Sequence, residues 1–207
     1  MEYLVTMTTH VPDGTPQQEV DDVRAREAAH SGELAAQGHL LRLFRPPLEP
    51  GEWRTLGLFA AAGAGRLEEV LASMPLRVWR TDEVTPLSPH PNDPGGPTGP
   101  GQATEFLTTF TIAIPDGTPE QAVQQAEAAE AARARELAGQ GHLERLWALG
   151  PGRTLGLWRA QDPAEMQAIL KSLPLDAWMD VETTPLTEHP SDPAKDPGDT
   201  ARGGTGT

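Results

Sequence analysis

The chain of 207 residues contains no cysteine and has few aromatic residues. Without cysteine it has no disulfide framework, no thiol nucleophile and no cysteine-ligated metal. Basic residues are also scarce, since 16 Lys and Arg stand against 30 Asp and Glu, for a net charge of -14. This excess of negative charge argues against nucleic acid or an anionic membrane surface as a partner. An anionic small molecule remains compatible with it, because the local placement of arginine decides such binding.

Long apolar segments are absent as well. No stretch reaches the length of a transmembrane helix, and the amino terminus lacks the basic and apolar regions of a signal peptide. We therefore expect no membrane partner and a cytoplasmic location. The sequence also has no Gly-rich phosphate loop, no nucleophile elbow and no metal-ligand spacing among its histidines. We predict neither a metal nor a cofactor.

The sequence contains the same module twice. Three motifs recur in the same order: Pro-Asp-Gly-Thr-Pro at 12–16 and 115–119, Gln-Gly-His-Leu at 37–40 and 140–143, and His-Pro at 90–91 and 189–190. A tandem duplication predicts two small domains with a pseudo-twofold relation. We assign module 1 to 1–93 and module 2 to 104–192. Residues 94–103, rich in Pro and Gly, are expected to be a linker, and residues 193–207 a disordered tail.

Each module shows the same order of strand and helix patterns. In module 1 we expect strands at 3–11, 39–45, 53–60 and 77–85 and helices from Pro16 to about Gln37 and over 65–74. In module 2 we expect strands at 105–114, 142–148, 153–159 and 176–184 and helices from Pro119 to about Gln140 and over 163–173. Thr15 and Thr118 are placed to cap the long helices, and Gly38 and Gly141 suit their left-handed ends.

The predicted fold class follows from this order. It is α+β, with two ferredoxin-like β-α-β-β-α-β modules. Helices cover one face of each four-stranded antiparallel sheet and leave the other face bare. We therefore expect the two modules to pair sheet to sheet as a fused dimeric α+β barrel.

A carboxylate interrupts the apolar stripe of the long helix in both modules. Glu27 comes seven residues after Val20 and seven before Leu34, and spacing by seven keeps residues on nearly one face. Glu130 holds the same position in the second helix. Burial raises the pKa of a carboxyl group towards neutrality, which suits a general base or acid. The alternative, a carboxylate at the edge of the stripe that pairs with an arginine or reaches water, stays open.

Arginines on the second strand are candidate ligands for a substrate carboxylate. Arg42 and Arg145 share a strand face with apolar neighbours, and a guanidinium can hold a carboxylate in a bidentate manner. A structural role for both, such as neutralising the helix carboxylate, stays open. Arg45 has Ala148 as its counterpart, so a role in only one copy is possible. His90 and His189 follow the last strands, in segments able to reach a neighbouring module's cavity.

Further motifs carry a resemblance to a known family. They are Met7-Thr8, the helix with Glu27, the stretch from Gly38 to Leu43-Phe44-Arg45, Leu173-Pro174-Leu175, Trp178-Met179-Asp180-Val181-Glu182 and the closing His-Pro. In order and spacing the modules resemble muconolactone Δ-isomerase, of the catechol branch of the β-ketoadipate pathway, over nearly all of 1–93 and 104–192. The resemblance implies ferredoxin-like subunits that assemble into symmetric oligomers, with active sites at the seams between subunits.

The resemblance also implies a chemistry. A carboxylate takes a proton alpha to a carbonyl of an unsaturated lactone and returns it at the far end of the dienolate, without a cofactor. Glu27 and Glu130 match the family's helix carboxylate, and His90 and His189 match its carboxy-terminal histidine. Arg24, three positions before Glu27, is replaced by Glu127 in module 2. We therefore hypothesise that the Glu27 site is the one that holds an anionic lactone.

Two other interpretations remain. One is a tailoring enzyme of secondary metabolism, cyclase-like or dehydratase-like, acting on a polyketide-like carbonyl compound. The other is a non-catalytic small-molecule binding protein, because one scaffold hosts many functions. In each case we expect a small-molecule ligand and a homo-oligomer of fused pseudo-dimers.

Overall fold

The computed structural model describes residues 1–96 and 103–194, so most of the predicted linker and tail lies outside the described residues. The chain forms two compact units. Unit 1 consists of Met1–Pro86 together with the segment from Glu188 onward, and unit 2 consists of Leu87–Thr187. The units therefore differ from the two sequence modules at the end of each module, because residues 87–93 belong to unit 2 and the segment from Glu188 belongs to unit 1. The last residues of each module pack with the body of the other.

The order of elements in each half is the predicted one. Module 1 contains β1 (Glu2–Thr9), α1 (Gln17–Ala36), β2 (Leu40–Arg45), β3 (Arg54–Ala60), α2 (Ala64–Ser73), the 3-10 helix η1 (Pro75–Trp79) and β4 (Arg80–Pro89). Module 2 contains β5 (Thr104–Ile112), α3 (Glu120–Gly139), β6 (Leu143–Gly150), β7 (Arg153–Ala160), α4 (Pro163–Lys171), η2 (Asp176–Trp178) and β8 (Met179–Glu188). None of the described helices is both long and apolar enough to cross a membrane.

Antiparallel pairing orders the strands within each unit. In unit 1, β3 pairs with β1 and with β2. In unit 2, β7 pairs with β5 and with β6, and β5 also pairs with β8. The end of β4 belongs to this unit as well, because Ser88 and Pro89 pair with Ala148 and Trp147 of β6. The fold is thus mixed α+β with antiparallel strands and four α-helices among the described residues.

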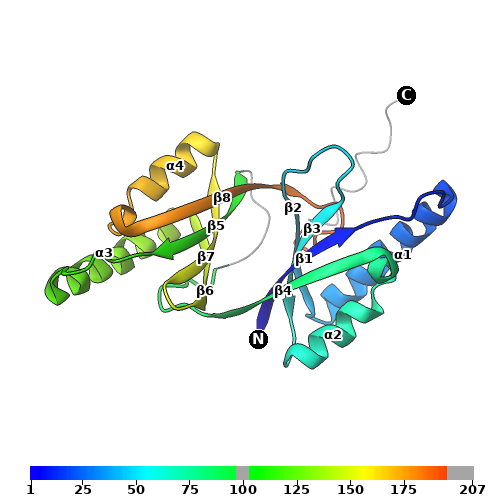
Figure 1. Ribbon diagram of the computed structural model, residues 1–207, viewed down its shortest axis with the longest axis horizontal. Coiled ribbons are helices and arrows are strands. Elements are labelled where there is room, and N and C mark those ends of the chain that lie inside the picture. Colours follow the sequence, from blue (N-terminus) through cyan, green and yellow to red (C-terminus); the bar gives the residue numbers. More distant parts are fainter. Residues whose placement is uncertain (97–102, 195–207) are drawn as a thin grey trace. The chain divides into compact units, whose positions relative to one another are not determined.

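One apolar core lies between strands and helices in each unit. Burial alternates along β1, so that Tyr3, Val5 and Met7 face the helices, as a period of two requires. They pack with Leu34 of α1 and Leu71 of α2, and Figure 1 shows both helices beside these strands. The corresponding core of unit 2 contains Phe106, Phe110, Leu137, Trp158 and Met166.

The sequence predicted the carboxy-terminal ends of the long helices correctly, but not the caps at their amino-terminal ends. Gly38 and Gly141 have φ of 74° and 80°, which confirms the predicted left-handed ends. The predicted threonine caps are wrong, because α1 begins after Pro16 without a side-chain cap. The Thr15 hydroxyl donates instead to the carbonyl of Pro12 at 2.7 Å, and Thr118 repeats this bond. The hydroxyl closes the Pro-Asp-Gly-Thr turn and is therefore engaged outside the helix.

The last strand of each module begins later than predicted. Residues 77–79 and 176–178 lie in η1 and η2, and the strands start at Arg80 and Met179. Pro75 fits the first position of η1, where no N–H donor is needed. The N–H groups at the start of a short helix have no partner inside it. In unit 1 the N–H of Leu76, within η1, donates to Glu27, and in unit 2 the N–H of Leu175, just before η2, donates to Glu130.

Candidate functional site

Each unit contains a cavity beside its long helix, and each cavity includes a predicted glutamate. The first, of about 230 Å³, lies in unit 1 and is lined by Glu27 and by residues of β1, β2, β3, η1 and the segment from His189. The second, of about 380 Å³, lies in unit 2 and is lined by Glu130 and the corresponding elements, with His90. We call them the Glu27 cavity and the Glu130 cavity.

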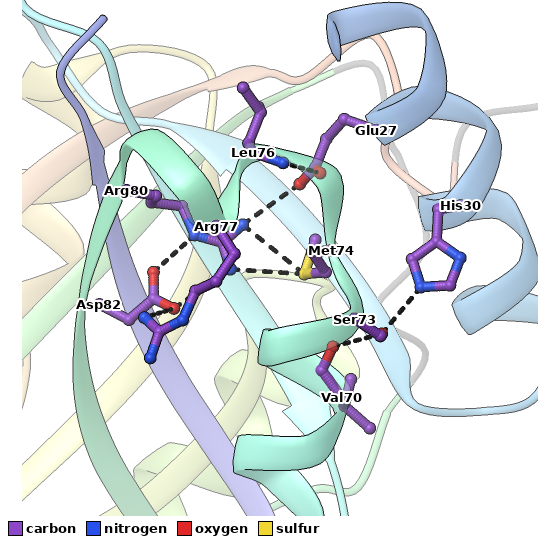
Figure 2. A network of polar contacts seen from close by, with 9 residues as sticks. All are labelled: Glu27, His30, Val70, Ser73, Met74, Leu76, Arg77, Arg80 and Asp82. Carbon is purple, nitrogen blue, oxygen red and sulfur yellow. Dashed lines mark hydrogen bonds and ion pairs between the residues drawn. The ribbon is translucent and has the colours of Figure 1, made fainter. Parts of the chain in front are cut away.

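Two donors hold the carboxylate of Glu27 in place. The backbone N–H of Leu76 donates to Oε2 at 2.8 Å, and Arg80 Nη1 donates to Oε1 at 3.2 Å (Figure 2). The Glu27 side chain is 12% exposed. Burial raises the pKa of Glu27, and it outweighs the Leu76 N–H and the Arg80 charge, which lower it. The carboxyl group is therefore both oriented and more basic than an ordinary glutamate.

Arg80 is a cavity residue that was not predicted from the sequence. Its guanidinium is 2% exposed, bonds both oxygens of Asp82 and lies 3.6 Å from the sulfur of Met74 (Figure 2). Arg77 bonds the same Asp82 from the other side. The spacing of Arg80 and Asp82 by two along β4 places both side chains on one strand face. Both residues lie within the strand predicted at 77–85, so that alternation was an available signal.

Arg24 and Arg45, two of the arginines proposed from the sequence as substrate ligands, also line the Glu27 cavity. Arg24 lies one turn before Glu27 on α1, and its guanidinium is 4.9 Å from the ring centre of Trp53. Arg45 is the last residue of β2. The cavity wall thus carries three guanidinium groups and one carboxylate. Such a wall favours an anionic ligand.

The histidine of the Glu27 cavity comes from the end of module 2. His189 belongs to unit 1 and lines the cavity, which agrees with the expected reach of the His-Pro segments. The backbone N–H of Ser191 donates to His189 Nδ1 at 3.1 Å. Burial, together with the charge of Arg45, lowers the pKa of His189 to about 4. The imidazole is therefore neutral at pH 7, and its proton is on Nε2, because Nδ1 accepts a bond.

Arg42 and Arg145, predicted as substrate ligands, lie among neither cavity's lining residues. Arg42 Nη2 is 2.9 Å from Oδ2 of Asp192, with both side chains 1% exposed. The Leu43 N–H donates to the same carboxylate. Arg145 pairs with Asp93 in the same way, in a more exposed position. These pairs hold the His-Pro segments against β2 and β6, which corresponds to the structural role that the sequence left open.

The Glu130 cavity keeps the same two chemical groups. Glu130 Oε2 accepts the N–H of Leu175 at 3.0 Å, and burial raises the pKa of Glu130. The Asn92 N–H donates to His90 Nδ1 at 3.1 Å, and burial lowers the pKa of His90. Glu127, the counterpart of Arg24, lines this cavity. Its polar groups therefore match the Glu27 cavity in the acid and the histidine, but not in the arginines.

The described residues contain no group of three or more His, Cys, Asp or Glu side chains placed to hold a metal ion. The polar groups of both cavities are suited to proton transfer and hydrogen bonding. What each cavity offers is a carboxylate with a raised pKa and a neutral imidazole.

Solved structures with a similar backbone show the fold class. A structure described as a novel heme-binding protein from Thermus thermophilus has a TM-score of 0.57 at 12% identity, over 91% of this chain and 92% of that chain. Structural neighbours of this kind are dimeric α+β barrel proteins, the fold class expected from the sequence. At this identity the likeness concerns the fold alone.

Sequence comparison identifies the family. A family model described as muconolactone delta-isomerase matches residues 1–93 and 104–192. Muconolactone Delta-isomerase of Cupriavidus pinatubonensis (strain JMP 134 / LMG 1197) is 33% identical over 92 residues, 44% of this chain and 97% of that protein. Muconolactone Delta-isomerase 1 of Acinetobacter lwoffii is 33% identical over 95 residues, 44% of this chain and 93% of that protein. The chain is therefore an isomerase of the muconolactone delta-isomerase family that carries the family's module twice.

Proposed function

We propose that the Glu27 cavity moves a proton across a small unsaturated lactone that carries a carboxylate, as muconolactone does. The observation that carries this proposal is the position of Glu27. It is a carboxylate oriented by two donors, with a raised pKa, on the wall of a cavity that also holds three arginines. The reaction needs no group beyond the side chains of the cavity.

Glu27 is the proposed base. Its ionised carboxylate removes a proton from the saturated carbon next to the carbon–carbon double bond that is conjugated with the lactone carbonyl. The electron pair moves through that double bond to the carbonyl oxygen as a dienolate forms. The same carboxyl group, now protonated, returns the proton to the carbon at the other end of the conjugated system. The electron pair returns from oxygen to carbon, so that the double bond has moved and nothing else has changed. A raised pKa makes the carboxylate a stronger base for the first step.

His189 is the proposed donor to the carbonyl oxygen. Its Nδ1 accepts the Ser191 N–H, so Nε2 carries the proton and can donate a hydrogen bond. Negative charge develops on the carbonyl oxygen as the dienolate forms, and a fixed donor stabilises that charge. A neutral imidazole is suited to this role because it donates without giving up its proton.

Arg24 and Arg45 are the proposed partners of the substrate carboxylate. Both line the cavity, and both guanidinium groups add positive charge to its wall. A guanidinium binds a carboxylate through two parallel hydrogen bonds. Binding there would orient the lactone ring towards Glu27.

Hydrogen exchange tests the proposed reaction directly. Muconolactone incubated with the protein in deuterated water is expected to gain deuterium at the two ends of its conjugated system, because proton removal by Glu27 is reversible. Proton NMR follows the loss of each signal, with the heat-denatured protein as the control. Absence of exchange above that control would contradict the proposal.

The dependence of rate on pH tests the identity of the base. We expect kcat/KM to fall as the pH drops through the raised pKa of Glu27, so that the acid limb lies above the range of an ordinary glutamate. Replacing Arg80 and Asp82 together by Met and Val, their counterparts in module 2, removes two opposing charges: that of Arg80, which lowers this pKa, and that of Asp82, which raises it to a smaller extent. The limb is then expected to move to higher pH. A limb at an ordinary glutamate pKa that the double variant leaves in place would count against Glu27 as the base.

We also propose that the two ferredoxin-like modules pair as a fused dimeric α+β barrel, and that fused chains assemble further into homo-oligomers. Support for the pairing comes from the β-α-β-β-α-β order and from the likeness to the Thermus thermophilus protein over most of the chain. A covalent link makes such a pair independent of protein concentration.

A further inference from the structure

None of the three arginines that line the Glu27 cavity has an arginine at the equivalent position of the Glu130 cavity. The positions equivalent to Arg24, Arg45 and Arg80 are occupied by Glu127, Ala148 and Met179. Among the described residues that line the Glu130 cavity there is no arginine or lysine, and its two acidic residues are Glu127 and Glu130. An anion entering this cavity would meet two carboxylates and no guanidinium.

The replacement of Arg80 is matched by that of its partner. Asp82, which pairs with Arg80 in unit 1, has Val181 as its counterpart, and Arg80 has Met179. Met179 and Val181 both pack against the apolar core of unit 2. Removing one partner of a buried ion pair is costly, whereas replacing both by apolar residues is tolerated. The charged pair of unit 1 thus corresponds to an apolar pair beside the cavity of unit 2.

The remaining wall of the Glu130 cavity is apolar and more spacious. Its aromatic and aliphatic lining residues include Phe110, Ile112, Leu146, Trp158 and Leu175. Thr9 of the Glu27 cavity is replaced by Ile112, and Trp53 by Gly152. The loss of that indole side chain is consistent with the larger volume, about 380 Å³ against about 230 Å³. A wall of this composition favours a flat apolar ligand.

We infer that the Glu130 cavity is a second ligand site, which takes uncharged, apolar carbonyl compounds and rejects the anionic lactone that the Glu27 cavity takes. A neutral ligand buries its apolar surface against Phe110 and Trp158 without desolvating a charge. An anion would lose its hydration and gain no cation in return. The chain then has two cavities, at equivalent positions of its two modules, with opposite preferences for ligand charge.

The Glu130 cavity also keeps the groups that the proposed proton transfer uses. Glu130 accepts the Leu175 N–H, and His90 accepts the Asn92 N–H at Nδ1, so its Nε2 is the donor. Glu130 can remove a proton from the saturated carbon next to a double bond that is conjugated with a neutral ligand's carbonyl and return it at the other end of the conjugated system. This catalytic part of the inference rests on the proposed function, whereas the binding preference does not.

Two tryptophans allow the cavities to be observed separately. Trp53 lines the Glu27 cavity and Trp158 lines the Glu130 cavity. With 5-fluorotryptophan incorporated into the full chain, their fluorine NMR signals can be assigned from single Trp→Phe variants. Muconolactone and its methyl ester are the two probes, since the ester removes the charge and adds only a methyl group. We expect the ester to shift the Trp158 signal at concentrations at least about tenfold lower than muconolactone does, a difference of about 1.4 kcal/mol.

Two results would overturn the inference. One is a Trp158 signal that neither probe shifts, and the other is equal affinity of the two probes at Trp158. Neither depends on turnover, so a failure of the proposed function at Glu27 would show only as missing deuterium exchange. If the protein showed no turnover but the expected pattern of shifts, the inference of a second ligand site would stand and the proposed function would not.

A charge-exchange variant tests whether the absence of arginine causes the preference of the Glu130 cavity for an uncharged ligand. Glu127→Arg with Ala148→Arg places the counterparts of Arg24 and Arg45 of unit 1 into unit 2. We expect muconolactone to gain at least about tenfold in affinity at Trp158 and the ester to lose affinity there, with the Trp53 signal unaffected. Thermal melting checks that the variant folds. If it does not fold, Glu127→Arg alone makes the same test at the cavity wall, and an unchanged preference in the folded variant would contradict the inference.

Discussion

Replacing Glu27 by glutamine is expected to lower kcat for the anionic lactone by about 10²–10⁴-fold, the usual contribution of general acid-base catalysis. Glutamine keeps the size of the side chain and an oxygen that can accept the Leu76 N–H, but it cannot take a proton. Binding of the lactone should persist, because the arginines of the cavity wall are unchanged. The measurement is steady-state turnover of muconolactone, together with the Kd of the variant.

Glu130→Gln is the matched control for this variant. It makes the same change at the equivalent position of the other cavity, where we expect the anionic lactone to bind poorly. Turnover of muconolactone should therefore stay within about twofold of the unmodified protein. Equal losses in the two variants would contradict the assignment of the anionic substrate to the Glu27 cavity. Unchanged turnover in both would favour a different base. Loss of turnover in Glu27→Gln with ligand binding retained would exclude a non-catalytic binding protein.

Replacing Asp192 by alanine is expected to destabilise unit 1 by about 3–5 kcal/mol. The Arg42–Asp192 pair is almost fully buried, so the variant removes the Asp192 carboxylate from a guanidinium in the interior. The bond from the Leu43 N–H is lost as well. Urea unfolding of the full chain, followed by tryptophan fluorescence, measures the change. We also expect lower activity, because the segment that carries His189 loses its attachment to β2.

Two controls accompany this prediction. Asp93→Ala breaks the equivalent pair with Arg145 in unit 2, where the side chains are 15% and 17% exposed, so a smaller loss is expected. The double variant Arg42→Met with Asp192→Leu removes both charges and should recover most of the stability. A loss in Asp192→Ala no larger than in Asp93→Ala would show that burial of the first pair does not matter. Recovery of stability without recovery of activity would separate packing of the segment from the position of His189.

The sequence predicted the features that depend on local pattern. The β-α-β-β-α-β order follows from hydrophobic periodicity and turn residues, and the left-handed helix ends at Gly38 and Gly141 follow from the freedom of glycine. The start of the last strand was predicted too early, because Leu76 to Trp79 is apolar enough to suit a strand. A 3-10 turn after Pro75 occupies these residues instead. The threonine caps were wrong for a related reason, since one hydroxyl can serve either the turn or the helix.

The sequence by itself determined the duplication, the family and the two helix glutamates, because repeated motifs and a carboxylate within an apolar stripe are visible without coordinates. Only the tertiary structure decided which groups surround those glutamates. Arg80 is 53 positions from Glu27, and Asp192 is 150 positions from Arg42, so no local pattern joins them. The pairing of such distant residues depends on how the elements pack and where each His-Pro segment lies. That packing made Arg42 a structural residue and Arg80 a member of the cavity wall.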